Sequence, residues 1–167
     1  SSGYGAVRIQ AMKTLVAFKD RTAMVAIARS FEETLLDPEL GKYGYRMSGF
    51  LESALEPADE DWVLRVFFNL AGKPGPRFWA KSLNTRFSGS EKLRIGLQQE
   101  CRHEDPRRRQ EAMFFLHHGG VIGREEIFKQ LLDDDNSTIR LIAQSFLGDR
   151  EAHRTLCATE GFNYLPN

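Results

Sequence analysis

Residues 124–147 read REEIFKQLLDDDNSTIRLIAQSFL, and they contain two helical patterns on either side of the acidic turn 133–135. In the second pattern Ile139, Ala143 and Leu147 follow one another at intervals of four residues. This spacing places the three side chains on one face of a helix, where the small alanine lets a neighbouring helix approach closely. The stretch therefore predicts two helices that are joined by a short turn and packed as antiparallel neighbours.

The second half of this stretch belongs to a frame, V/I-R-x-x-A-x-x-x-L, that occurs three times in the chain. Residues 7–15 and 139–147 match it in full, whereas residues 108–116 keep its Arg, Ala and Leu but begin with Arg108. The last two copies begin 31 residues apart, a period that fits a repeat of two helices. The chain is therefore predicted to contain stacked helix pairs.

Turn-forming residues divide the rest of the chain into further helical patterns, so that about ten helices are expected. No segment of the sequence alternates between apolar and polar residues as a strand does, and turn pairs typical of β-hairpins do not occur. Both observations predict an all-α fold. The expected helices cover residues 6–18, 20–35, 37–55, 57–71, 76–83, 88–101, 105–119, 124–133, 136–147 and a short segment from 149.

The three frames, with Asp105 and Asp135 ahead of the last two, resemble second helices of the HEAT-repeat family and of its bacterial lyase-type HEAT-like branch. The resemblance is specific over residues 105–148 and at the N-terminal helix, whereas the repeats over residues 37–104 are irregular. It implies a right-handed α-solenoid of about five stacked antiparallel helix pairs, with residues 1–167 forming a single HEAT-like repeat domain. The second helices would line a concave surface that holds proteins and, in some members, nucleic acid.

The first predicted helix has the pattern of a second helix, which leaves it without the first helix of its pair. The ends of a solenoid are normally closed by a capping unit with a polar outer face. We therefore expect the chain to be a fragment of a longer protein, or to dock its N-terminus on something else.

The composition is that of a soluble globular chain, with 41% hydrophobic and 28% charged residues. The 23 basic and 23 acidic residues give a net charge of zero, which argues against a dedicated nucleic-acid-binding domain. No apolar run approaches the roughly 18 residues that a membrane span needs, so no membrane partner is expected. Two cysteines are too few for a disulfide scaffold and indicate a reducing compartment, the cytoplasm.

The charges are distributed unevenly, because residues 1–72 carry a net charge of −2, residues 73–109 one of +6 and residues 110–167 one of −4. The basic segment also contains aromatic residues, a combination that suits contacts with phosphates and stacking on bases. Nucleic-acid binding through residues 73–109 is therefore the alternative hypothesis, and the resemblance extends to HEAT-like alkylpurine DNA glycosylases. The simpler interpretation is that the aromatic side chains belong to the core and the basic ones to a solvated face.

The repeated arginines Arg8, Arg109 and Arg140 allow two interpretations. They can form an exposed basic stripe for an acidic partner, or a ladder of hydrogen bonds that ties helices to turns. Asp105 lies four residues before Arg109, and Asp135 lies five residues before Arg140. This spacing favours the ladder, because charge-assisted hydrogen bonds there also satisfy the starts of the helices.

Residues able to bind metals or perform catalysis do not form a known pattern. Cys101, His103 and the pair His117–His118 lack the spacing of a zinc site, and adjacent helical residues point about 100° apart. Cys101 continues an apolar stripe and is expected to be buried, while the histidine pair is expected near helix carbonyls, where a cation is favoured. The sequence contains no Walker loop, G-x-S-x-G, H-E-x-x-H or C-x-x-C motif, so neither catalysis nor a cofactor is expected.

These observations predict a non-catalytic scaffold that binds another protein, or another domain of the same full-length chain, on the face of its second helices. Nucleic acid is the alternative partner, and a lyase or glycosylase of HEAT-like form is a third hypothesis. A few aromatic or arginine anchors are expected to dominate the binding face. The residues expected to line it are Arg77, Trp79, Arg109, Phe114, His117, Arg140 and Gln144.

Overall fold

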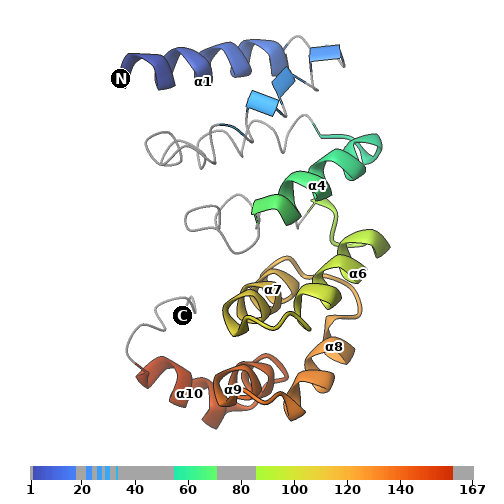
Figure 1. Ribbon diagram of the computed structural model, residues 1–167, viewed down its shortest axis with the longest axis vertical. Coiled ribbons are helices and arrows are strands. Elements are labelled where there is room, and N and C mark those ends of the chain that lie inside the picture. Colours follow the sequence, from blue (N-terminus) through green and yellow to red (C-terminus); the bar gives the residue numbers. More distant parts are fainter. Residues whose placement is uncertain are drawn as a thin grey trace. The chain divides into compact units, whose positions relative to one another are not determined.

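A computed structural model of the chain describes residues 2–17, 22–23, 26–27, 29–30, 33, 55–70 and 86–159 (Figure 1). Every secondary-structure element within these ranges is helical, which confirms the predicted all-α class. The chain divides into two compact units, Ser1–Phe87 and Ser88–Asn167. No helix in the described ranges is long and apolar enough to span a lipid bilayer.

The first unit contains α1 (Ser2–Ala17), the short 3-10 helix η2 (Pro57–Asp59) and α4 (Glu60–Leu70). Together η2 and α4 form the helix predicted from Pro57, with a first turn that is tighter than an α-helix. The helices predicted over 37–55 and 76–83, and most of the one predicted over 20–35, lie outside the described residues.

A buried carboxylate organises the start of this helical segment. Asp59 is 3% exposed and accepts hydrogen bonds from the backbone nitrogen of Glu56, at 2.8 Å, and from Nε1 of Trp62, at 2.9 Å. These bonds compensate for the loss of water around the carboxylate. Glu60 and Asp61 then occupy the first turn of α4, where acidic side chains stabilise the positive end of the helix dipole.

The first copy of the frame, in α1, does not form a buried stripe. Val7 is 68% exposed, Leu15 is 37% exposed, and Ala11 between them is exposed as well. The stripe of this copy is therefore exposed, and no described helix covers its face. Apolar spacing determines which side chains share a face but not what packs on it. The side chain of Arg8 lies outside the described residues.

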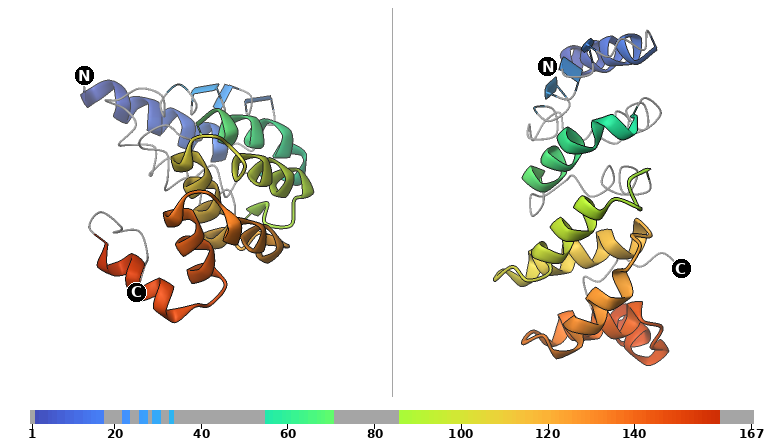
Figure 2. Two further views of the ribbon diagram at one scale, coloured as in Figure 1. Left: turned by 60° about the horizontal axis from the view of Figure 1, so that its bottom comes forward. Right: turned by 90° about the vertical axis from the view of Figure 1, so that its right-hand side faces the viewer.

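The second unit consists of consecutive helices joined by short turns, and it confirms the helices predicted from residue 88 onward. The helix α9 packs against α7 and α10, which are shown from other directions in Figure 2. The elements are α6 (Glu91–Glu100), α7 (Pro106–His118), α8 (Arg124–Gln130), the 3-10 helix η3 (Leu131–Asp133), α9 (Ser137–Phe146) and α10 (Arg150–Ala158).

Polar side chains fix where these helices begin. Asp105 caps α7, Asn136 caps α9 and Asp149 caps α10. Ser90 caps α6, because its Oγ accepts the hydrogen bond of the backbone nitrogen of Leu93 at 3.0 Å. The carboxylate of Glu91 pairs with Arg94 one turn further along α6.

The alanines of the other two frames lie in the core, as predicted. Ala112 of α7 is 2% exposed and Ala143 of α9 is 0% exposed, and these two helices pack against each other. Leu116 at the end of the second frame is fully buried as well. Leu147 is 36% exposed, because α9 ends one residue before it and the chain turns away.

Candidate protein-binding site

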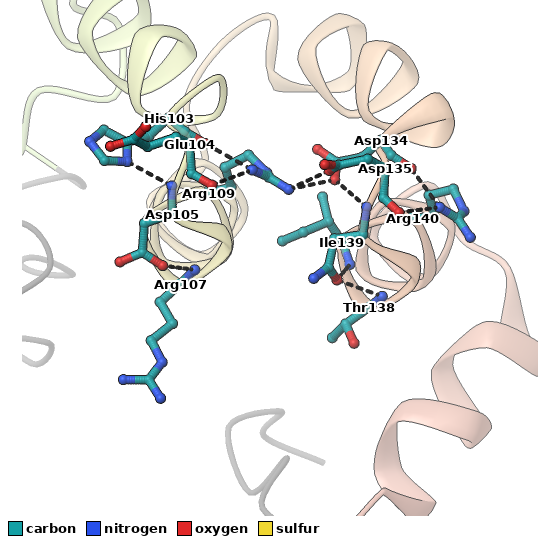
Figure 3. A network of polar contacts seen from close by, with 11 residues as sticks. His103, Glu104, Asp105, Arg107, Arg109, Asp134, Asp135, Thr138, Ile139 and Arg140 are labelled. Carbon is teal, nitrogen blue, oxygen red and sulfur yellow. Dashed lines mark hydrogen bonds and ion pairs between the residues drawn. The ribbon is translucent and has the colours of Figure 1, made fainter.

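The turn before α9 is held by an arginine from the helix that comes after it. Nη1 of Arg140 donates hydrogen bonds to the carbonyl oxygens of Asp134, at 2.5 Å, and Asp135, at 3.1 Å (Figure 3). Side chains on a helix lean toward its N-terminus, so an arginine in the first turn lies over the preceding turn. Arg140 therefore fixes the backbone of the acidic turn from which α9 begins.

The turn before α7 is held in the same way. Nη1 of Arg109 donates hydrogen bonds to the carbonyl oxygens of His103, at 2.9 Å, and Glu104, at 3.0 Å. In both turns the accepting carbonyls belong to the residues six and five positions before the arginine. We call this contact between Nη1 and two carbonyls the arginine clamp. The repeat in the sequence is thus also a repeat of hydrogen bonds.

Arg109 makes a second set of contacts, which joins its turn to the next one. Its Nη2 donates hydrogen bonds to Oδ1 of Asp134, at 2.8 Å, and to Oδ1 of Asp135, at 2.7 Å. Figure 3 shows the guanidinium between the two turns. A single arginine therefore ties the start of α7 to the start of α9.

These contacts confirm the ladder interpretation for both arginines but correct its partners. Asp105 does not pair with Arg109, because its carboxylate caps α7 by accepting a hydrogen bond from the backbone nitrogen of Arg107 at 2.9 Å. Arg140 binds the carbonyl of Asp135 rather than its carboxylate, which is taken by Arg109. Arg109 thus takes its acidic partners from the next turn of the chain, not from its own.

Only one of the two carboxylates that bind Arg109 is shielded from water. The side chains of Arg109 and Asp134 are 9% and 8% exposed, whereas that of Asp135 is 89% exposed. Asp134 also accepts a hydrogen bond from the backbone nitrogen of Asn136 at 2.9 Å, which compensates in part for its burial. A hydrogen bond with Asp134 and the charge of Arg109 lower the pKa of Asp135, so its ionised form is favoured.

A cavity of about 240 Å³ lies beside these ion pairs, lined by polar side chains that include Gln98, Arg102 and Gln130. Nη2 of Arg102 donates a hydrogen bond to Oε1 of Gln130 at 3.2 Å across one wall. Nε of Arg109 is buried beside it without a hydrogen bond inside the described part of the chain. Pockets that enclose a drug-sized ligand usually measure roughly 300–1,000 Å³, so this cavity suits water or one small polar group.

The structure places the predicted binding residues in different surroundings. Gln144 is exposed, and Arg140, four residues earlier on α9, is partly exposed. Arg109 is 7% exposed, so the expectation that it lines an open face is wrong. The physical reason is that its guanidinium is occupied by the turns on both sides. Arg77 and Trp79 lie outside the described residues.

The predicted residues Phe114 and His117 belong to a cluster of rings at the C-terminal end of α7. His117 stacks on Phe146 of α9 with ring centroids 4.0 Å apart, and Phe114 meets Phe146 edge-on at 5.5 Å. Partial burial, together with His118 and Arg124, lowers the pKa of His117 to about 4. The expectation of a cation here is therefore wrong for His117, since its desolvated ring favours the neutral form.

Two residues of these contacts, Asp134 and Phe146, have no role in the sequence-based prediction. The sequence nevertheless contains a signal for Asp134, because the acidic run 133–135 follows Arg109 within one 31-residue period of the repeat. No comparable signal marks Phe146, which meets its partner rings across a helix contact. Spacing within one helix does not report such contacts.

The described histidines and cysteines show no metal centre. In the ranges that the structure covers, no group of three or more His, Cys, Asp or Glu side chains could hold a metal ion. Cys101 is 1% exposed, and burial raises its pKa to about 12, which confirms the prediction of a buried thiol. His103 is engaged by the chain, since its Nδ1 accepts a hydrogen bond from the backbone nitrogen of Asp105 at 3.0 Å.

The second cysteine, Cys157, is exposed on α10. Its Sγ lies 3.7 Å from Nε2 of His153, and Nδ1 of the same ring lies 3.2 Å from Oγ of Ser145. These contacts join α10 to α9 through polar side chains. They link two helices of the second unit at its surface.

Three arginines in the described part of the basic segment are paired with acidic side chains. Arg108 forms two hydrogen bonds with the carboxylate of Glu100, at 2.6 and 2.8 Å, and Arg94 pairs with Glu91. Arg109 is bound to the acidic turn, and residues 73–85 lie outside the described residues. Paired arginines present little net charge to phosphates, whereas Arg102 and Arg107 of the same segment are exposed.

The geometry thus defines a class of protein: an all-helical chain in which consecutive turn–helix units are joined by arginine contacts. The chain matches no protein-family model, no curated protein and no solved structure. The resemblance to HEAT repeats therefore stays a prediction, and the contacts themselves are the basis for a functional proposal.

Proposed function

We propose that this chain is a non-catalytic scaffold that binds a protein partner on the face of its second helices. The observation that supports this proposal is the arginine clamp, which recurs at Arg109 and Arg140 with the same two carbonyl positions. A recurring clamp indicates recurring helix pairs, and stacked helix pairs form extended surfaces suited to holding other proteins. The proposed architecture is a short α-solenoid of the HEAT type.

The helix α9 supplies the centre of the proposed binding surface. Arg140 and Gln144 are four residues apart and therefore share a face of this helix. Phe146, six residues after Arg140, lies on the face of α9 that meets α7, where its ring stacks on His117. Arginine side chains are frequent anchors of protein interfaces, so Arg140 is the expected anchor of this surface.

The proposal places the protein in a reducing compartment, the cytoplasm. Both cysteines are free thiols, and Cys157 is exposed to solvent. Free exposed thiols are maintained where glutathione and thioredoxin keep them reduced. A protein partner of the same compartment is therefore expected.

Quantitative affinity enrichment from the producing cells tests the proposal with three baits: the wild-type chain, Gln144→Glu and Gln99→Glu. Gln99 is an exposed residue of α6, so it provides the same chemical change away from α9. We expect a protein that wild type and Gln99→Glu enrich equally and that Gln144→Glu enriches at least tenfold less. Calorimetry with the purified partner should reproduce this order. Equal binding by all three baits would contradict the proposal.

A further inference from the structure

We propose that Arg140 is a binding site for the paired carboxylates of an acidic turn in a partner polypeptide. This inference rests on the proposed function, because it names the chemistry that the partner brings to α9. The ligand is a pair of adjacent aspartate or glutamate side chains. They are bound by the guanidinium nitrogen that the arginine clamp does not use.

Arg109 provides the template for this site within the same molecule. While its Nη1 is fixed on two carbonyls, its Nη2 donates hydrogen bonds to the carboxylates of two consecutive residues, Asp134 and Asp135, at 2.8 and 2.7 Å. The clamp sets the plane and direction of the guanidinium before the carboxylates arrive. Little side-chain freedom is then lost on binding, so a clamped arginine is preorganised for carboxylates.

Arg140 has the same clamp without the carboxylates. Its Nη1 is held on the carbonyls of Asp134 and Asp135, and no acidic side chain in the described part of the chain lies within ion-pair distance of it. Figure 3 shows Arg140 on the opposite side of the acidic turn from Arg109. The side chain is also partly exposed, so a ligand can reach it from solvent.

The charge around Arg140 favours a short acidic turn over a long polyanion. Residues 110–167 carry a net charge of −4, and the acidic run 133–135 lies directly beside the clamp. A nucleic acid would bring many phosphates into this negative field and would be repelled. A turn with two adjacent carboxylates brings only two charges into this field, so it is repelled less than a polyanion.

The test is an NMR titration of the isotope-labelled full chain with a capped peptide of the sequence LLDDDNS, which is residues 131–137. We expect a saturable shift of the Nε–Hε resonance of Arg140. Arg154, an exposed arginine of α10 paired with Glu151, should not shift. A peptide with the last two aspartates replaced by asparagine, LLDNNNS, should bind at least tenfold more weakly. An equal response to acetate at the same carboxylate concentration would overturn the proposal.

Two variants of the arginine separate binding from folding. Arg140→Gln should abolish the saturable response, and Arg140→Lys, which keeps the charge but not the forked geometry, should weaken it severalfold. The backbone amide spectrum of each variant shows whether α9 is still folded. If Arg140→Lys keeps the wild-type fold and the wild-type affinity, the clamp geometry is irrelevant and the proposal is wrong.

Glu160, the last acidic residue of the sequence, provides a further test. If Glu160→Gln shifts the Arg140 resonance of the free protein, the carboxylate belongs to this chain and the proposed partner ligand is overturned. The inference also fails separately from the proposed function. A partner that is lost with Gln144→Glu but fully kept with Arg140→Gln would retain the scaffold and exclude the arginine site.

Discussion

Arg109 and Arg140 hold the turns before α7 and α9 with the same clamp, yet their guanidiniums have different surroundings. Arg109 is 7% exposed and binds two carboxylates of the next turn, whereas Arg140 is partly exposed and has no such pair among the described residues. The difference arises from the acidic turn between η3 and α9, whose carboxylates cover only Arg109. The same residue of the frame therefore joins two turns at Arg109 and, as proposed, binds a partner at Arg140.

The largest effect is expected from Arg109→Gln. This change removes the cation beside Asp134, whose carboxylate is 8% exposed and would be left buried without its counter-charge. Breaking one side of a buried ion pair typically costs about 3–5 kcal/mol. Amide hydrogen exchange of α7 and α9 measures this loss for the second unit alone. An effect no larger than that of Arg140→Gln would show that burial does not distinguish the two arginines.

The second prediction concerns the pH dependence of stability, because His117 at the C-terminal end of α7 has a lowered pKa. The pKa of His117 is about 4 in the folded chain and near 6.5 when the residue is unfolded, mainly through burial. The unfolded chain therefore binds the proton first, so the contribution of neutral His117 is complete above pH 6.5 and is lost between pH 6.5 and about 4. With allowance for solvent screening at this half-buried ring, the loss is on the order of 1–2 kcal/mol.

His117→Phe is the matched control for this pH dependence. Phenylalanine keeps the stacking on Phe146 but has no titrating group, so thermal stability should depend less on pH than in the wild type over the same window. The exposed His153, replaced by phenylalanine in the same way, reports on the loss of a histidine elsewhere. If both variants keep the wild-type pH dependence, His117 is not the group responsible.

Most of the fold of the second unit could be predicted from the sequence, because it depends on local signals. Capping residues such as Asp105 and Asn136 satisfy nearby backbone nitrogens, and the spacing of Ala143 marks a buried stripe within a single helix. The same frame around Ala11 lies on an exposed face of α1. Burial of its stripe depends on a neighbouring helix, which no pattern inside α1 reports.

The sequence could predict that the frame arginines form a ladder of hydrogen bonds, but not which residues they bind. The frame arginines and the nearby acids indicate a ladder, yet sequence distance favours Asp105 as the partner of Arg109. In the structure Asp105 is used as a helix cap, and the carboxylates come from the next repeat, 25 and 26 residues away. Which turn covers an arginine depends on the stacking of helix pairs, so local spacing could not decide it.

A smaller effect is expected when the second clamp is removed. Arg140→Gln loses two hydrogen bonds to backbone carbonyls of a turn that solvent can reach, and each such bond contributes about 0.5–1.5 kcal/mol. The expected loss is about 1 kcal/mol, since water replaces part of the contact. Hydrogen exchange at the start of α9 measures it against Gln99→Glu as a neutral control. A loss as large as that of Arg109→Gln would mean that Arg140 is also a buried link.

The smallest effect is expected for the exposed carboxylate of the pair that Arg109 binds. Asp135 is 89% exposed, so water replaces most of what Arg109 provides when Asp135→Asn removes the charge. Exchange rates in α9 should change less than about threefold. Asp134→Asn, at the buried end of the same guanidinium, should change them far more. Because the pKa of Asp135 is lowered in the folded chain, its small contribution to stability is present above pH 3.8. This contribution is lost as the pH falls further. If the two aspartates behave alike, exposure does not control the strength of this link, and the contrast between Arg109 and Arg140 must have another cause.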